Sequence, residues 1–199
     1  DLDYLPSTNE TYVERAGLTW FNTYRPSDVL SAEGDASPFV DFVAYLVPAQ
    51  AERDHLLKMI AWTVRYPGRK LRHALMMRSK EQGIGKSMLA EIWGLLLGKS
   101  NVRKTTTEEV SGQYQGFIKE TLLVLLEELN WGFGPTGYNR LKDLITGSEA
   151  SVNEKFLSVR SWPNVATFVI FTNLQTPMIV EDRDRRIYYI DTPALKRSP

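Results

Sequence analysis

The chain has 199 residues, a formal net charge of +0 and 43% hydrophobic residues, which suits one substantial domain with a small appendage. The absence of cysteine excludes disulfide bonds and thiolate metal sites. The balanced charge argues against a protein that coats DNA broadly, but it allows contact with a strand through a few residues per subunit.

No stretch approaches the roughly 18 consecutive apolar residues of a membrane span, and the N-terminus lacks the pattern of a signal peptide. We therefore expect a soluble intracellular protein with no membrane partner. The chain begins with Asp rather than Met, so we expect a fragment of a longer protein. His55 and His73 lie far apart in the sequence without the spacing of metal ligands, and no zinc site is expected.

Three regions are predicted along the chain. Residues 1–35 are rich in Pro, Ser, Asn, Asp and Gly and predict an irregular lead-in with one short strand over 18–24. Residues 36–70 predict a small helical region of two helices, because Ser37-Pro38 is a typical helix start and apolar residues then recur at helical spacing. Residues 71–199 are predicted to form the core that carries the chemistry.

The core opens with an apolar strand over 74–77, a polar turn and an amphipathic helix from about Ser87. The turn ends in Gly-Ile-Gly-Lys-Ser, the end of a phosphate-binding loop. Backbone N–H groups can wrap a phosphate only where no Cβ intrudes, hence Gly83 and Gly85, and the positive end of the helix points at the same anion. Lys86 would reach the β and γ phosphates, and the Ser87 hydroxyl would bind Mg²⁺.

One position departs from the usual loop, because Lys80 stands where the first glycine is expected. The alternative is an ordinary helix start with the letters Gly-Lys-Ser. The predicted nucleotide-binding residues are Gln82, Gly83, Ile84, Gly85, Lys86, Ser87 and Met88.

After Thr121, a continuous apolar run over 122–126 predicts a strand buried on both faces. It ends in Glu127 and Glu128, and ligands bind at the carboxyl ends of strands in open α/β sheets. Glu127 would support Mg²⁺, usually through water, and Glu128 would polarise the attacking water. The alternative is a strand that ends in solvated glutamates. Glu127 also replaces the aspartate that is more usual there.

The remaining pattern predicts a helix over 107–120 with interruptions near Gly112 and Gly116, a helix over 138–146, and a hairpin-like segment over 147–163. A second buried strand, 165–172, ends in Asn173, whose amide could orient the attacking water or sense the γ phosphate. The alternative is a simple turn residue.

A mixed charge run precedes the last predicted strand, 187–191. One of its arginines, Arg183, Arg185 or Arg186, could reach the nucleotide of a neighbouring subunit as an arginine finger. The alternative is a solvated charged face.

The order of these motifs resembles the superfamily 3 helicases, and more narrowly the helicase part of phage, plasmid and poxvirus primase–helicases. The resemblance covers about residues 20–192. Its most specific part is the succession Leu141-Lys142-Asp143-Leu144-Ile145-Thr146-Gly147, Lys155, Thr172-Asn173 and Asp184-Arg185-Arg186.

The resemblance implies an α/β fold: an AAA+-like P-loop NTPase core with a central, mostly parallel sheet flanked by helices. It also implies a ring, usually a hexamer, that hydrolyses ATP with Mg²⁺ between subunits and pulls single-stranded DNA through its pore. Carried onto this chain, Glu128 is the catalytic base, Asn173 the sensor, and Arg185 or Arg186 the finger in trans. Lys155, near the tip of a pore hairpin that also carries Arg160, would grip the phosphate backbone. Neighbouring glutamates that offset its charge keep a purely solvated Lys155 open.

Three hypotheses follow. The first is an ATP-dependent helicase motor, fused to or associated with a primase or polymerase domain, in the cytoplasm of a bacterial host or phage-infected cell. The second is a degenerate nucleotide-binding ring or scaffold of a replication protein without unwinding activity, which Lys80 and Glu127 keep open. The third, a small-molecule P-loop kinase, is less consistent with the Glu-Glu strand end, the Asn strand and the Asp-Arg-Arg run.

Overall fold

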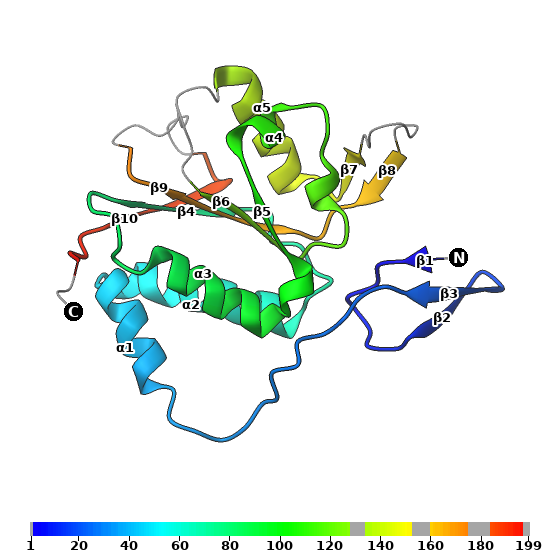
Figure 1. Cartoon of the computed structure of the whole chain (residues 1–199), viewed down its shortest axis with the longest axis horizontal. Helices are drawn as coiled ribbons and strands as arrows, with labels where there is room; N and C mark the ends of the chain where they lie inside the picture. Colours follow the sequence, from blue (N-terminus) through cyan, green and yellow to red (C-terminus); the bar gives the residue numbers. More distant parts are fainter. Residues whose placement is uncertain (1, 128–133, 153–159, 175–183, 197–199) are drawn as a thin grey trace.

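The computed structural model describes residues 2–127, 134–152, 160–174 and 184–196. Its centre is a five-stranded, all-parallel sheet flanked by helices (Figure 1), with the strand order β10-β4-β9-β6-β5. The strands span Ala74–Ser79 (β4), Val102–Thr105 (β5), Leu123–Glu127 (β6), Thr167–Thr172 (β9) and Ile187–Thr192 (β10). The α/β class with a mostly parallel sheet is confirmed.

The three central strands are buried on both faces, as their uninterrupted apolar runs predict. Successive side chains point to opposite faces of a strand, and in β4 they enter two separate cores. Leu75 and Met77 belong to the core on one face, whereas Ala74 and Met76 belong to the core on the other.

Helices cover both faces of the sheet (Figure 1). One face packs against α1 (Ser37–Leu46), α2 (Gln50–Arg65) and α3 (Lys86–Leu97). The other packs against α5 (Gly134–Thr146) and the short α4 (Thr107–Ser111). The two helices predicted before the phosphate loop are therefore confirmed. Within the part of the chain that the structure describes, no helix has the length and apolar character needed to cross a membrane.

The helix predicted over 107–120 is interrupted near Gly112 and Gly116, as predicted, but less of it is helical than expected. Thr106 and Glu109 form a capping box that starts α4, but α4 ends at Ser111, and a 3₁₀ turn, Gly116–Ile118, follows separately. Gly112 leaves the helix in an extended conformation.

The N-terminal region is more regular than the predicted lead-in. It forms a small sheet of three strands in the order β1-β3-β2, Leu2–Asp3, Leu18–Asn22 and Tyr12–Arg15, where one strand was expected. The buried side chain of Asn22 organises it by bonding to the backbone of Leu5, Thr8 and Glu10. These hydrogen bonds join separate segments of the N-terminal region. They produce no periodic pattern in the sequence from which the sheet could be predicted. The division of the chain at residues 35 and 70 stays a prediction.

The predicted hairpin is present as the antiparallel pair β7 (Glu149–Val152) and β8 (Arg160–Pro163). It is joined to the edge of the sheet where the parallel strands begin, because Asn164 and then β9 follow β8 directly. Asn164 donates to the carbonyls of Ser148 and Leu144 and accepts from the ammonium group of Lys70. The base of the hairpin is thus fixed to the body of the molecule.

Candidate phosphate-binding site

The turn between β4 and α3 has the conformation that its glycines predict. Gly83 and Gly85 have φ angles of 74° and 111°, a region that residues with a Cβ rarely adopt. The space beside Gly85 is also closed, because a Cβ there would lie 2.9 Å from the ring of Phe42. The predicted succession of strand, glycine-containing turn and helix is therefore present.

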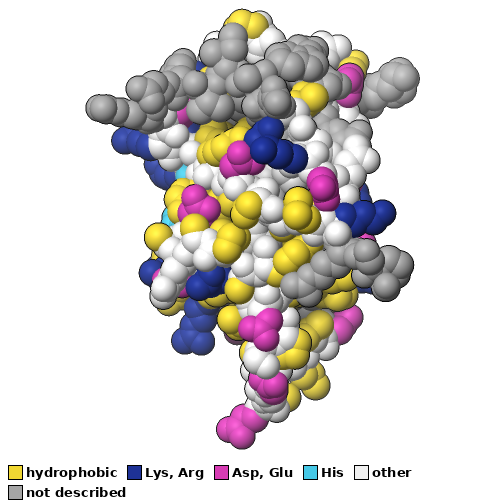
Figure 2. Space-filling view, turned by 90° about the vertical axis from the view of Figure 1, so that its left-hand side faces the viewer, with side chains coloured by type: hydrophobic (Ala, Val, Ile, Leu, Met, Phe, Trp, Pro, Cys, Tyr) yellow, Lys and Arg dark blue, Asp and Glu magenta, His cyan; other side chains and the backbone are white. Residues whose placement is uncertain are grey.

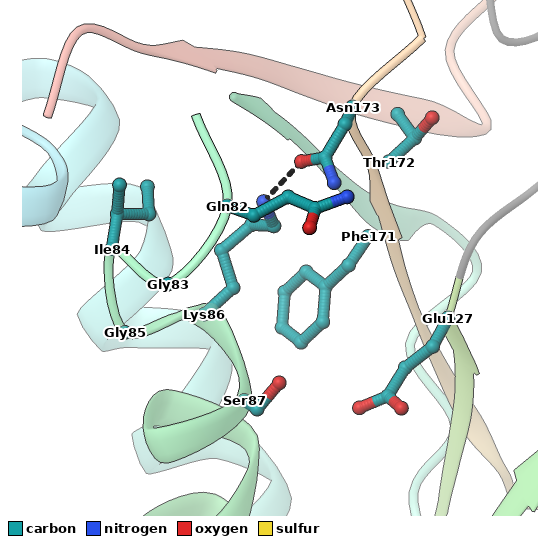
Figure 3. A pocket seen from close by; sticks show the side chains of 10 residues that line it. All are labelled: Gln82, Gly83, Ile84, Gly85, Lys86, Ser87, Glu127, Phe171, Thr172 and Asn173. Atoms are coloured by element: carbon teal, nitrogen blue, oxygen red, sulfur yellow. Dashed lines mark hydrogen bonds between the residues drawn. The ribbon is translucent and has the colours of Figure 1, made fainter. Parts of the chain in front are cut away.

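A hollow of about 340 Å³ lies against this loop, at the carboxyl ends of β4, β9 and β6. Because β9 lies between β4 and β6, Asn173 stands between the loop and Glu127 (Figure 3). The lining residues are Gln82, Gly83, Ile84, Gly85, Lys86, Ser87, Glu127, Phe171, Thr172 and Asn173. The structure thus brings together most of the residues that the sequence predicted for nucleotide and metal.

The side chain of Lys86 is held within this hollow by neutral oxygens. Its ammonium group donates to the amide oxygen of Asn173 at 2.7 Å and to the hydroxyl of Ser79. The Ser79 hydroxyl lies 2.9 Å from the same amide oxygen. Burial lowers the pKa of Lys86. An anion such as phosphate would supply the counter-charge that these two partners do not.

Glu127 and Ser87 face the same space in Figure 3. Glu127 ends β6, and both of its carboxylate oxygens lie 3.5 Å from the ammonium group of Lys104 on β5. A hydroxyl and a carboxylate are the oxygen ligands that Mg²⁺ accepts, and Mg²⁺ usually completes its shell with water and substrate phosphates. No cluster of three His, Cys, Asp or Glu ligands occurs among the described residues. The residues therefore fit a metal held jointly with a phosphate.

Met88 does not line this hollow. It is 54% exposed and lines a second hollow on the other side of the loop, together with residues of α1. Glu128, Lys155 and Arg183 lie outside the described residues, so their predicted roles stay predictions. Arg160 is exposed in β8 of the hairpin.

Arg185 and Arg186 lie far from the hollow of their own chain. The carbonyl of Arg186 accepts from the backbone N–H of Ala74, at the start of β4, whereas the hollow lies at its end. Five residue steps along a strand make this separation roughly 16 Å. These arginines are thus distant from the nucleotide site of their own chain, and their role as a finger toward another subunit stays a prediction.

Asp184 holds this segment against α5. Its carboxylate accepts from the hydroxyl of Tyr138 and from the backbone N–H of Arg186. Burial acts to raise the pKa of Asp184, but these hydrogen bonds and the positive charges of Arg186 and Lys142 outweigh it and leave that pKa lowered.

Arg78 and Ser79, which end β4, also border this site, although no motif in the sequence predicted them. Arg78 is buried, bonds both carboxylate oxygens of Asp191 at 2.9 and 2.8 Å, and donates from Nε to the carbonyl of Leu174 at 2.9 Å. This last bond fixes the backbone next to Asn173. Two polar residues at the carboxyl end of a buried strand were the available signal, since ligands gather at that edge.

His55 and His73, which lie far apart in the sequence, are neighbours in the structure. Their Nε2 atoms are 3.0 Å apart, and the His55 ring stacks on Tyr188 with centroids 3.9 Å apart. Burial lowers the pKa of both histidines, with a smaller contribution from Lys58 for His55 and from His55 for His73. His55 on α2 thus contacts both the residue before β4 and a residue of β10, two segments that are distant from it in the sequence.

The chain is similar, in sequence and in structure, to proteins of the phage NrS-1. The chain is 23% identical over 196 residues to the "DNA Primase-polymerase" of Nitratiruptor phage NrS-1, covering 94% of this chain and 27% of that protein. Two solved apo structures of the NrS-1 C-terminal region superpose with TM-scores of 0.81 and 0.80 at 22% identity. They match 97% and 96% of this chain and 47% and 46% of the solved chains.

The chain therefore spans about a quarter of the curated relative and just under half of the solved chains. At this level of identity the solved structures establish a shared fold. The family described as of unknown function, DUF5906, matches residues 77–186, from the phosphate-loop strand to the Asp-Arg-Arg run. This match covers more than half of the chain and includes every described residue that the sequence predicted for phosphate, metal and sensor. The chain belongs to the DUF5906 family.

Proposed function

We propose that this chain is the ATPase motor of a ring-forming helicase in phage or mobile-element DNA replication. One observation carries the proposal: the ends of three neighbouring strands bring Lys86 with Ser87, Asn173 and Glu127 around one hollow. These are a cation for phosphate, a hydroxyl and a carboxylate for Mg²⁺, and an amide for the water or the γ phosphate. Similarity to a phage primase-polymerase supports the replication context.

In this proposal the loop holds the triphosphate of ATP, with Lys86 on the β and γ phosphates. Mg²⁺, when bound, neutralises charge on the phosphates, and Ser87 and Glu127 would hold it directly and through water. Glu128 follows Glu127 and acts as the base for the attacking water. Asn173 orients that water from the neighbouring strand end.

The motor works as a homo-oligomeric ring, a hexamer by the resemblance. The position of Arg185 and Arg186 at the edge opposite their own hollow supports a finger that acts on the next subunit. The β7–β8 hairpin at that same edge would contact single-stranded DNA through Lys155 and Arg160. A ring turns one cation per subunit into a collar of positive charge around the phosphate backbone. A primase or polymerase domain would be fused to the motor or associated with it.

A second candidate is a nucleotide-binding scaffold that does not unwind DNA. The contact of Glu127 with Lys104 favours it, because a carboxylate partnered by a lysine is a weaker metal support. Lys80, at the position of the usual first glycine, favours it as well.

The deciding experiment is the rate of Mg²⁺-dependent ATP hydrolysis with and without single-stranded DNA, measured alongside the mass of the protein by light scattering. A motor gives a ring-sized species with an ATP analogue and a rate that DNA raises. A ring that binds ATP and hydrolyses it equally slowly with and without DNA favours the scaffold. Lack of any ATP binding overturns both.

Three variants locate the activity. Lys86→Ala should abolish ATP binding, whereas Lys58→Ala, on the exposed side of α2, should leave it unchanged. Glu128→Gln should keep binding and lose hydrolysis, and surviving turnover would exclude Glu128 as the base. Lys155→Ala should keep basal hydrolysis and lose the response to DNA.

A further inference from the structure

A second hollow, of about 380 Å³, lies on the other side of the phosphate loop. Its walls are α1, the loop and the first turn of α3, and its lining residues are Pro38, Asp41, Phe42, Tyr45, Gly83, Ile84, Gly85 and Met88. Gly83, Ile84 and Gly85 line both hollows. The two spaces therefore meet along one short stretch of backbone, and a single ligand can occupy both.

The lining of this second hollow differs from that of the first. Lys86, Ser87, Glu127 and Asn173 line only the first hollow, whereas Phe42, Tyr45 and Met88 line only the second. Hydrophobic side chains also reach the surface on the face seen in Figure 2, which is the left-hand side of the molecule in Figure 1, where α1 lies. A volume within the roughly 300–1,000 Å³ of small-molecule pockets and an aromatic lining suit a flat, partly apolar group.

We propose that this second hollow is the nucleobase subsite of the chain, with the base held between Phe42 of α1 and Met88 of α3. The assignment rests on the proposed function, because it requires that the first hollow holds the phosphates. Met88 directly follows Ser87 and is 54% exposed. Its thioether can lie against an aromatic ring, a contact that sulfur favours. The Phe42 ring offers a stacking surface of the kind that every base accepts.

Asp41 supplies the polar end of the subsite. Of the described residues that line the hollow it alone is charged, and an ionised carboxylate only accepts hydrogen bonds. The group that faces it must therefore donate, as the exocyclic amino group of adenine does. This assigns to Asp41 a preference for a base that carries such an amino group.

The subsite is formed before any ligand binds. The Phe42 ring lies so close to Gly85 that a Cβ at that position would be only 2.9 Å from it. The hydroxyl of Tyr45 donates to the carbonyl of Leu195, and the backbone N–H of Lys196 donates to the carboxylate of Glu81 at 2.7 Å. The C-terminal segment thus ties α1 to the residues that precede the loop. A rigid site loses less conformational freedom on binding.

The test compares ATP with inorganic tripolyphosphate, both with Mg²⁺, by calorimetric titration of the whole chain. Met88→Gln and Phe42→Ala should each weaken ATP binding by about tenfold, the effect of losing one base-stacking contact, and leave tripolyphosphate binding unchanged. Phe39→Ala, one turn earlier in α1 and outside the lining, is the matched control. Because Met88 is exposed, its variant tests the subsite even if Phe42→Ala fails to fold.

The outcomes separate the two assignments. If ATP and tripolyphosphate bind equally, and both variants leave ATP binding unchanged, the base subsite is overturned while the phosphate site stands. If neither compound binds, both assignments fail together. For Asp41, the wild type should bind ATP more tightly than the analogue that lacks the 6-amino group, and Asp41→Ala should remove this difference. An unchanged difference overturns the role of Asp41.

Discussion

The ammonium group of Lys86 lies 2.7 Å from the amide oxygen of Asn173, a residue 87 positions further along the chain. The contact exists because β9 pairs directly with β4, so that the two strand ends meet at the loop. In the proposed site the same amide oxygen that holds the lysine competes with phosphate for it. We therefore expect Asn173 to affect ATP binding as well as ATP hydrolysis.

Exchanging the amide of Asn173 for a carboxylate should weaken ATP binding. In Asn173→Asp the new carboxylate pairs with Lys86 and repels phosphate, and both effects weaken ATP binding. A charged hydrogen bond contributes about 1.5–3 kcal/mol. We therefore expect a loss of roughly 10- to 150-fold in ATP affinity. Asn173→Ala, the control, should bind ATP at least as well as the wild type and hydrolyse it more slowly. Titration with a non-hydrolysable analogue measures the first effect, and equal affinities for the two variants would contradict the competition.

Gly85→Ala should impair the loop without unfolding the chain. The new Cβ meets the Phe42 ring, and the φ of 111° is unfavourable for alanine, so the loop must shift. We expect at least a tenfold loss of ATP affinity with an unchanged circular dichroism spectrum. Gly34→Ala is the matched control, because nothing lies within 4 Å of a Cβ at that position. Normal affinity in Gly85→Ala would show that the loop accommodates a side chain.

The Arg78–Asp191 pair should respond unequally to the loss of either partner. The side chain of Arg78 is 9% exposed and that of Asp191 is 48% exposed. Asp191→Ala leaves a buried guanidinium without its counter-charge and should cost about 3 kcal/mol of unfolding free energy. Arg78→Met leaves only a hydrated carboxylate and should cost less, about 1–2 kcal/mol. Urea denaturation of both variants measures the difference, and equal losses would argue against this explanation.

The stability of the fold should decrease in mild acid because of the histidine pair. Burial lowers the pKa of His55 and His73 in the folded chain, whereas an unfolded histidine titrates near about 6.5. As the pH falls below about 6.5, the unfolded chain binds protons that the folded chain does not, and the free energy of unfolding decreases. Thermal melts between about pH 7.5 and 5.5 should show a falling midpoint.

The double variant His55→Phe with His73→Gln tests the origin of this effect. Its melting midpoint should depend less on pH over the same interval, whatever its absolute stability. An undiminished pH dependence in the double variant would assign the effect to other groups.

Local patterns determined much of this protein. The two helices before the loop, the strand, turn and helix around Lys86, the buried strands that end in Glu127 and Asn173, and the paired strands of the hairpin all follow from residue type and spacing. These features depend on neighbours in the chain: a positive φ requires glycine, and a strand buried on both faces requires an uninterrupted apolar run. The residues of the candidate phosphate site could therefore be named from the sequence.

The contacts between distant segments are visible only in the folded structure. There β9 lies between β4 and β6, His55 contacts His73, the N-terminal sheet is organised around Asn22, and Phe42 of α1 lies against the loop. Such contacts form when whole helices and strands pack against one another. The burial of apolar faces is non-directional, so a local sequence pattern shows which face of an element is buried but not which element covers it. The second hollow beside the loop belongs to this group, since its walls come from segments of the chain that only packing brings together.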